Sequence, residues 1–167
     1  AYDWHILTAD IFLVRFEIGL FKPKGTRIGA DIAGRVEAVG KNVQQFKPGD
    51  EVFGDLASCG GGGFAEYLTA PESYLALKPV NLSFEETAAI PMAAITALQG
   101  LRDEGKIQAG QKVLINGASG GVGTFAVQIA KFYGAEVTAV CSTRNLDLAR
   151  SLGVDHVIDY TQENFTE

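Results

Sequence analysis

The chain is poor in the residues that build thiol and imidazole metal sites. Its 167 residues include two cysteines, Cys59 and Cys141, and two histidines, His5 and His156. No Cys-x-x-Cys pair occurs, and a disulfide-stapled scaffold would need more cysteines. Isolated cysteines are typical of a reducing compartment, and no signal-peptide pattern opens the chain, so we expect a cytoplasmic protein.

Basic clusters and long apolar runs are missing as well. Lys and Arg number 14 against 20 Asp and Glu, which gives a net charge of −6. Since no Lys/Arg cluster occurs, nucleic acid is not an expected partner. The apolar run at 11–14 is broken by Arg15 and Glu17, well short of a membrane span. These absences leave a soluble globular protein.

The most informative segment is a glycine-rich turn that follows a short apolar run and opens a helical pattern. The run is Val113 to Ile115, and the helical periodicity continues to Lys131. Between them lie the residues that we expect to bind a dinucleotide: Gly117, Ala118, Ser119, Gly120, Gly121, Val122 and Gly123. Glycines let the backbone approach a pyrophosphate, and free N–H groups at the start of the helix face its charge. An ordinary strand-to-helix turn is the alternative, but the flanking pattern is the one that the motif requires.

Strand-like and helix-like patterns alternate after this turn. We expect parallel strands at 112–116, 135–140 and 156–159, with helices at 122–133 and 144–152 between them. This order is the βαβαβ half of a dinucleotide-binding fold, with right-handed crossovers. A second half normally completes such a fold, so we expect the chain to be a fragment.

The first eighty residues show a different, β-rich pattern. Strands are expected at 32–38, 52–53, 64–68 and 74–77. Ser83 and Glu86 form a capping box that opens a helix through Ile90, where Pro91 interrupts it, and residues 93–101 resume as a second helix. We therefore expect a small β-rich domain at 1–80 and a dinucleotide-binding domain at 81–167.

Together these motifs resemble a known superfamily. Residues 29–40 and 48–54 are similar to the barrel-domain signature of the medium-chain dehydrogenases/reductases. Residues 63–67, 89–91 and 116–123 resemble the zinc-free quinone oxidoreductase branch, the zeta-crystallin relatives. The resemblance covers essentially the whole chain. It implies an α/β protein with a partial GroES-like β-barrel domain and the N-terminal half of a Rossmann doubly wound parallel sheet, an active site between the two, and a homodimer when complete.

The zinc branch of the superfamily is a poor match. Gly29-Ala30-Asp31 stands where that branch has Gly-His-Glu, and the position of its cysteine ligand falls near Asp3. A catalytic zinc needs three protein ligands, so we expect no metal site. Without a Lewis acid, oxidation of an alcohol is difficult, whereas an already polarised enone is easier to reduce.

The short-chain dehydrogenases offer a competing interpretation. They share the glycine spacing, and Tyr74-x-x-x-Lys78 imitates their catalytic pair. In that family the pair follows the glycine turn and lies on a helix. Here it precedes the turn, in a strand-like segment that ends at Pro79. We therefore interpret Tyr74 and Lys78 as structural.

The choice of cofactor depends on the end of the second strand of the dinucleotide fold. An NAD site usually has an acid about 20 residues after the glycines, to bind the ribose 2′-hydroxyl. This chain has Ser142, Thr143 and Arg144 there, and the first acid is Asp147. Hydroxyls and a guanidinium can bind a 2′-phosphate that a carboxylate would repel. The resemblance adds Tyr160, where the family has a tyrosine beside that phosphate. We therefore predict NADPH; a solvated arginine and a packing tyrosine are the alternatives.

Candidate catalytic residues rest on the resemblance alone. His5 falls where some relatives have a tyrosine proposed to donate a proton, a step histidine can perform near neutral pH. It is equally interpreted as a residue at the pocket rim. Thr96 resembles a family residue near the nicotinamide, or is an ordinary helix threonine. The segment 11–21, with three phenylalanines, either lines an apolar substrate pocket or packs in the core.

Two functions remain open. The first is an NADPH-dependent oxidoreductase that reduces apolar quinones or α,β-unsaturated carbonyls by hydride transfer without zinc, mainly through orientation. The second is a non-catalytic NADP(H)-binding protein of the same fold, with a structural or sensory role. An assay of NADPH oxidation over enones and quinones separates them.

Overall fold

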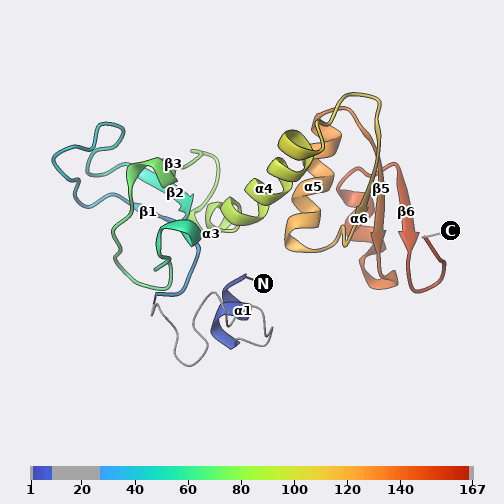
Figure 1. The fold of residues 1–167 in the computed structure, drawn as a ribbon, viewed down its shortest axis with the longest axis horizontal. Coiled ribbons are helices and arrows are strands. Elements are labelled where there is room, and N and C mark those ends of the chain that lie inside the picture. Colours follow the sequence, from blue (N-terminus) through green and yellow to red (C-terminus); the bar gives the residue numbers. More distant parts are fainter. Residues whose placement is uncertain (1, 9–26, 166–167) are drawn as a thin grey trace. The chain divides into compact units, whose positions relative to one another are not determined.

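The computed structural model describes residues 2–8 and 27–165. Contacts divide the chain into two compact units, Ala1–Met92 (unit 1) and Ala93–Glu167 (unit 2). Figure 1 shows short antiparallel strands in the first and a parallel sheet with helices in the second. Among the described residues, none of the helices has the length and apolar character that crossing a bilayer requires.

Unit 1 contains a three-stranded antiparallel sheet in the order β1-β2-β3. The strands are β1 (Asp31–Arg35), β2 (Glu51–Asp55) and β3 (Leu75–Leu77). Short 3-10 helices lie at Ala57–Cys59 (η1) and Glu72–Tyr74 (η2), and helix α1 (Tyr2–Thr8) precedes the sheet in the chain. Val52, in β2, and Leu56, directly after that strand, are buried. The expected strands at 52–53 and 74–77 are thus confirmed in position.

Strand β1 is shorter than the expected 32–38. Its ladder with β2 ends at Arg35, but Val36 still exchanges two hydrogen bonds with the β2 side: its N–H donates to Asp50 O at 2.9 Å and its carbonyl accepts from Gly49 N at 2.8 Å. The Pro48-Gly49-Asp50 turn begins the return toward β2 at this point, so residues 37 and 38 have no strand to pair with in the described part of the chain.

The expected strand at 64–68 is wrong. These residues form turns and bends, because the glycine run before them folds back on residues 28 and 29. The N–H groups of Gly62 and Gly63 both donate to Gly29 O, at 3.0 and 2.9 Å, and Phe64 N donates to Ile28 O at 3.2 Å. The side chain of Phe64 is 71% exposed. An alternating pattern alone cannot make a strand when the backbone groups are already used by a loop.

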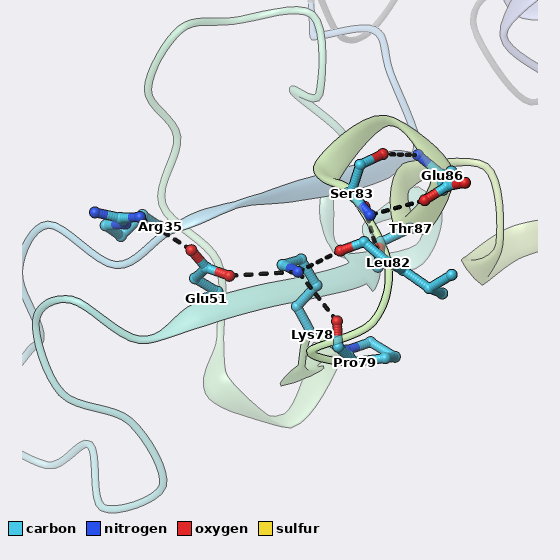
Figure 2. Close-up of polar contacts among 8 residues, drawn as sticks. All are labelled: Arg35, Glu51, Lys78, Pro79, Leu82, Ser83, Glu86 and Thr87. Atoms are coloured by element: carbon cyan, nitrogen blue, oxygen red, sulfur yellow. Dashed lines mark hydrogen bonds and ion pairs between the residues drawn. The ribbon is translucent and has the colours of Figure 1, made fainter.

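A buried lysine joins the end of β3 to the segment before α3 (Phe84–Ala88), as Figure 2 shows. The side chain of Lys78 is only 6% exposed; its Nζ donates to Pro79 O and Leu82 O and lies 3.3 Å from a carboxylate oxygen of Glu51. It also lies 5.2 Å from the centre of the Phe84 ring. The hydrogen bond from Arg35, with a smaller one from Lys78, lowers the pKa of Glu51. These contacts give Lys78 the structural role expected for it.

Helix α3 begins with the expected capping box. The Ser83 hydroxyl accepts from Glu86 N at 3.1 Å, and the Glu86 carboxylate accepts from Ser83 N at 2.8 Å (Figure 2). Pro91 then starts helix α4 (Pro91–Leu98), where its missing N–H costs nothing, instead of only interrupting a helix. The chain continues as a π-helix, η3 (Gln99–Glu104).

Unit 2 is the predicted βαβαβ arrangement. Strands β4 (Lys112–Asn116), β5 (Glu136–Cys141) and β6 (His156–Asp159) pair in parallel in that order. Helix α5 (Gly121–Phe132) packs on β4 and β5, and α6 (Leu146–Ser151) packs on β5 and β6 (Figure 1). The buried core between helices and sheet includes Ile115, Val127, Ala130, Val137, Ala139, Cys141 and Ala149. The expected strands and helices are therefore confirmed within one or two residues.

Candidate cofactor site

The glycine turn of unit 2 is anchored to the carboxyl end of the neighbouring strand. The N–H groups of Gly117 and Ala118 both donate to Val140 O at 3.1 Å, and Gly120 N donates to Gly117 O at 2.9 Å. Gly117 has a φ of 72°, in the left-handed region that favours glycine. The turn therefore has one fixed shape at the edge of the sheet where the strands end.

A close approach inside the turn requires glycine at one further position. A Cβ on Gly123 would lie 2.2 Å from Gly117 O and 2.8 Å from Ala118 Cα, both backbone atoms. A Cβ on Gly121 would meet nothing within 4 Å. Gly123 lets the first turn of α5 lie against the glycine turn, and Gly121 and Val122 stay exposed.

No side chain caps the beginning of α5. Its N-cap is Gly120, and the first N–H groups of a helix have no partner within the helix. With the positive end of the helix dipole, these groups form a favourable place for a phosphate. Because Gly120, Gly121 and Gly123 carry no side chain, the backbone here is open to a pyrophosphate, so the residues fit a dinucleotide.

The segment after β5 forms a short 3-10 turn, η4 (Thr143–Asn145), which carries the predicted specificity residues. Arg144 is exposed, and its guanidinium has no hydrogen bond or ion pair with any residue that the structure describes. The Asn145 amide donates to Ser119 Oγ at 3.0 Å and to Ser142 Oγ at 3.2 Å. It therefore connects the glycine turn to the end of β5.

Asp159, at the end of β6, is hydrogen-bonded to Thr143, the first residue of η4. Its carboxylate accepts hydrogen bonds from the Thr143 hydroxyl and, at 2.7 Å, from the Thr161 hydroxyl. Asp159 is 7% exposed, and these hydrogen bonds, that of Thr143 first, lower its pKa. Tyr160, 55% exposed, follows it, and its N–H donates to Cys141 O at 3.2 Å. Asp159 thus links the segment of Arg144 to the segment of Tyr160.

The structure brings the predicted cofactor residues of unit 2 to neighbouring loops, but sequence reasoning missed two residues that join them. The sequence predicts Asn145 inside a helix, whereas it directly precedes α6, and it predicts Asp159 at the end of a strand, where it lies, but indicates the side-chain contacts of neither. Both act across long sequence separations, 26 residues for Asn145 to Ser119 and 16 for Asp159 to Thr143. No local pattern signals such contacts.

The two candidate catalytic residues lie in different units. His5 is half-buried on α1 in unit 1, and Thr96 is exposed on α4 in unit 2. Their roles stay predictions. The segment 11–21, expected to line a substrate pocket or a core, lies outside the described residues.

Asp31, which stands where the zinc branch has a glutamate, has a structural contact. Its Oδ1 accepts the N–H of Met92, in the first turn of α4, at 2.7 Å, and burial raises its pKa. Within the described ranges, no group of three or more His, Cys, Asp or Glu side chains could hold a metal ion.

Two family models match this chain. Residues 2–80 match the alcohol dehydrogenase GroES-like domain, and residues 121–167 match the family described as zinc-binding dehydrogenase. The first covers the antiparallel sheet of unit 1, and the second runs from the start of α5 through β6.

Individual relatives agree with these models. A 2-methylene-furan-3-one reductase of Solanum lycopersicum is 44% identical over 90% of this chain and 42% of its own length. The chloroplastic quinone oxidoreductase QR1 of Triphysaria versicolor is 45% identical over 78% of this chain and 41% of its own. This chain therefore spans about two fifths of the length of these curated relatives.

Solved structures give the same result. The quinone oxidoreductase from Coxiella burnetii superposes with a TM-score of 0.86 over 98% of this chain and 51% of that one, at 32% identity. The enoyl reductase CurK gives a TM-score of 0.78 over 87% of this chain and 43% of that one, at 37% identity. A GroES-like domain followed by a Rossmann-type parallel sheet, with these relatives, places the chain in one family: it belongs to the medium-chain dehydrogenase/reductase superfamily.

Proposed function

We propose that the complete protein is an NADPH-dependent oxidoreductase that reduces quinones or α,β-unsaturated carbonyls without zinc. The observation that carries the proposal is the cofactor site of unit 2, where, among the described residues, no side chain caps α5 and none pairs with Arg144 after β5. The relatives named as quinone oxidoreductases and enone or enoyl reductases support the substrate class.

The charges at the end of β5 favour a 2′-phosphate over a 2′-hydroxyl. The first carboxylate after β5 is Asp147, which accepts from Arg150 at 3.1 Å. Both carboxylate oxygens of Asp159 are already used by Thr143 and Thr161. Asp159 is thus occupied and Asp147 is paired with Arg150, whereas the Arg144 guanidinium, without a partner among the described residues, is available to a phosphate dianion.

Different residues of the chain have different roles in binding the cofactor. The N–H groups at the start of α5 would bind the pyrophosphate, and Ser142, Arg144 and Tyr160 would bind the 2′-phosphate. Thr143 supports this region by fastening η4 to Asp159. When bound, NADPH supplies a hydride; a proton then completes the two-electron reduction. His5 is proposed either to give that proton or to shape the rim of the pocket, and Thr96 is proposed to lie beside the nicotinamide.

Three broader features belong to the same proposal. We propose a zinc-free mechanism because Ala30 stands at the histidine-ligand position and Asp31 is bonded to the first turn of α4. Domains at 1–80 and 81–167, a homodimeric complete protein and a cytoplasmic location complete it. Chloroplastic relatives exist, so fractionation of cells that express the complete protein is the test of the location.

The test of the cofactor is the replacement Arg144→Asp in the complete protein. Loss of one charge-assisted hydrogen bond should weaken NADPH binding by about 1.5–3 kcal/mol, while NADH binding changes little. Equal affinity of the unmodified protein for both cofactors would contradict the assignment. Oxidation of NADPH with a panel of enones and quinones tests turnover, and tight binding without any turnover would favour the non-catalytic alternative.

A further inference from the structure

Asn145 occupies a helix N-cap position without capping the helix. It directly precedes α6, and asparagine is among the residues most favoured there, because its side chain can accept a backbone N–H. Here no such bond is made. The amide donates instead to Ser119 Oγ and Ser142 Oγ, on two segments that are distant in the chain. The side chain therefore has a role other than capping the first turn of the helix.

These hydrogen bonds determine whether the two serine hydroxyls still have a proton to donate. A hydroxyl has one proton to donate and lone pairs to accept. Because Ser119 and Ser142 both accept from Asn145, each keeps its own proton for another acceptor. Neither hydroxyl donates to any group in the described part of the chain.

The hydroxyls of the neighbouring threonines, in contrast, already donate their protons. The hydroxyl protons of Thr143 and Thr161 are both given to the ionised Asp159. At the edge of the unit 2 sheet where the strands end, two threonine hydroxyls therefore already donate their protons to Asp159. The two serine hydroxyls can still donate theirs. The available pair lies on either side of Asn145, and Ser142 is two residues from the unpaired Arg144.

We propose that Asn145 is the positioning residue that makes this site select a phosphomonoester, the 2′-phosphate of the adenosine ribose, by keeping the protons of Ser119 and Ser142 available to donate. The inference rests on the NADPH assignment proposed above. Two hydroxyl donors and a guanidinium suit a dianion that only accepts hydrogen bonds. A neutral ribose hydroxyl gains much less from the same set.

The experiment measures the binding of NADP⁺ and NAD⁺ to the complete protein by isothermal titration calorimetry. Asn145→Ala should weaken NADP⁺ binding roughly tenfold, the scale of one hydrogen bond to a charged group, and leave NAD⁺ binding within about twofold. Asn145→Asp keeps the shape and suits an N-cap, but its carboxylate accepts the serine protons and repels phosphate. It should weaken NADP⁺ binding roughly a hundredfold.

A matched control lies on the same helix. Ser151→Ala removes a hydroxyl that donates to Leu148 O at 2.7 Å and should leave both affinities unchanged. Within the Asn145→Ala background, Ser142→Ala should cost less NADP⁺ affinity than it does alone, because the two act together.

The outcomes separate the two proposals. A loss of NADP⁺ affinity with unchanged NAD⁺ affinity supports the inference, since a merely structural role would weaken both. If the unmodified protein prefers NADP⁺ and both Asn145 variants keep that preference, or lose both ligands equally, the role of Asn145 is overturned while the NADPH assignment stands. If the unmodified protein shows no preference, both are overturned.

Discussion

Two glycines on the first turn of α5 should respond in opposite ways to the same substitution. In Gly123→Ala, the new Cβ would lie 2.2 Å from Gly117 O and 2.8 Å from Ala118 Cα. Ordinary contacts between such atoms are about 3.5–4 Å. Both clashing atoms are backbone atoms of a turn held by two hydrogen bonds to Val140 O, so neither can move alone.

Comparing the cost of overpacking with the gain in helix propensity predicts whether Gly123→Ala stabilises or destabilises the fold. Overpacking of this kind costs about 1–3 kcal/mol, and replacing a helical glycine with alanine returns at most about 1 kcal/mol. Gly123→Ala should therefore lower the free energy of unfolding by roughly 1–2 kcal/mol. Gly121→Ala meets nothing within 4 Å and has no left-handed φ, so it should be neutral or stabilising by up to about 1 kcal/mol.

Denaturant unfolding of both variants of the complete protein measures the difference. We expect the two alanine variants to differ by roughly 2 kcal/mol, or several degrees in Tm. The Gly123 variant should also bind NADPH more weakly, because the turn must move. Equal stability of the two variants would refute the argument that the close approach requires glycine at 123.

Four further outcomes can be measured on the complete protein. Lys78→Met removes the donor to two carbonyls and Glu51, so the free energy of unfolding should fall by about 2–4 kcal/mol; an unchanged denaturation midpoint would contradict its structural role. The Thr143 hydrogen bond lowers the pKa of Asp159, so this carboxylate stabilises the fold above its unfolded pKa of about 4, and that contribution is lost as pH falls through the lower folded value. Asp159→Asn should therefore lose less stability than the unmodified protein on acidification below about pH 5, and parallel losses would count against the pairing. His5→Phe should lower kcat by roughly 10²–10⁴ if His5 donates the proton, but change only KM if His5 shapes the rim, which steady-state kinetics on one enone decides. Elemental analysis should find no stoichiometric zinc and a chelator should leave NADPH oxidation intact, whereas one tightly held zinc per chain would refute the zinc-free assignment.

Most of unit 2 can be predicted from sequence because its signals are local. The glycine turn, the β-branched runs and the glycines after each helix lie within a few residues of the elements they specify. Gly134, two residues after the end of α5, has a φ of 78°, the left-handed conformation typical of a glycine that follows a helix. Parallel pairing then follows from the alternation of strands and helices.

In unit 1, local sequence patterns are not sufficient to predict the structure. Residues 64–68 alternate like a strand, but a strand needs a partner, and their position is decided by hydrogen bonds to Ile28 and Gly29 far back in the chain. The same limit applies to the site. The sequence predicts Asn145 inside a helix at 144–152, and nothing near it in the chain indicates that its side chain contacts Ser119 of the glycine turn.

Each unit carries one of the chain's two thiols, and the buried one can serve as a reporter of local opening. Cys141 is 1% exposed in the core of unit 2, and burial, followed by the charge of Asp159, raises its pKa. Alkylation of this thiol in the native protein therefore requires β5 to become accessible, so its rate measures how often that core opens. Cys59, half-buried on η1 in unit 1, can react without such an opening and gives a reference rate in the same molecule. The two alkylation rates, followed by mass spectrometry, allow the opening of the unit 2 core to be timed without introducing a label.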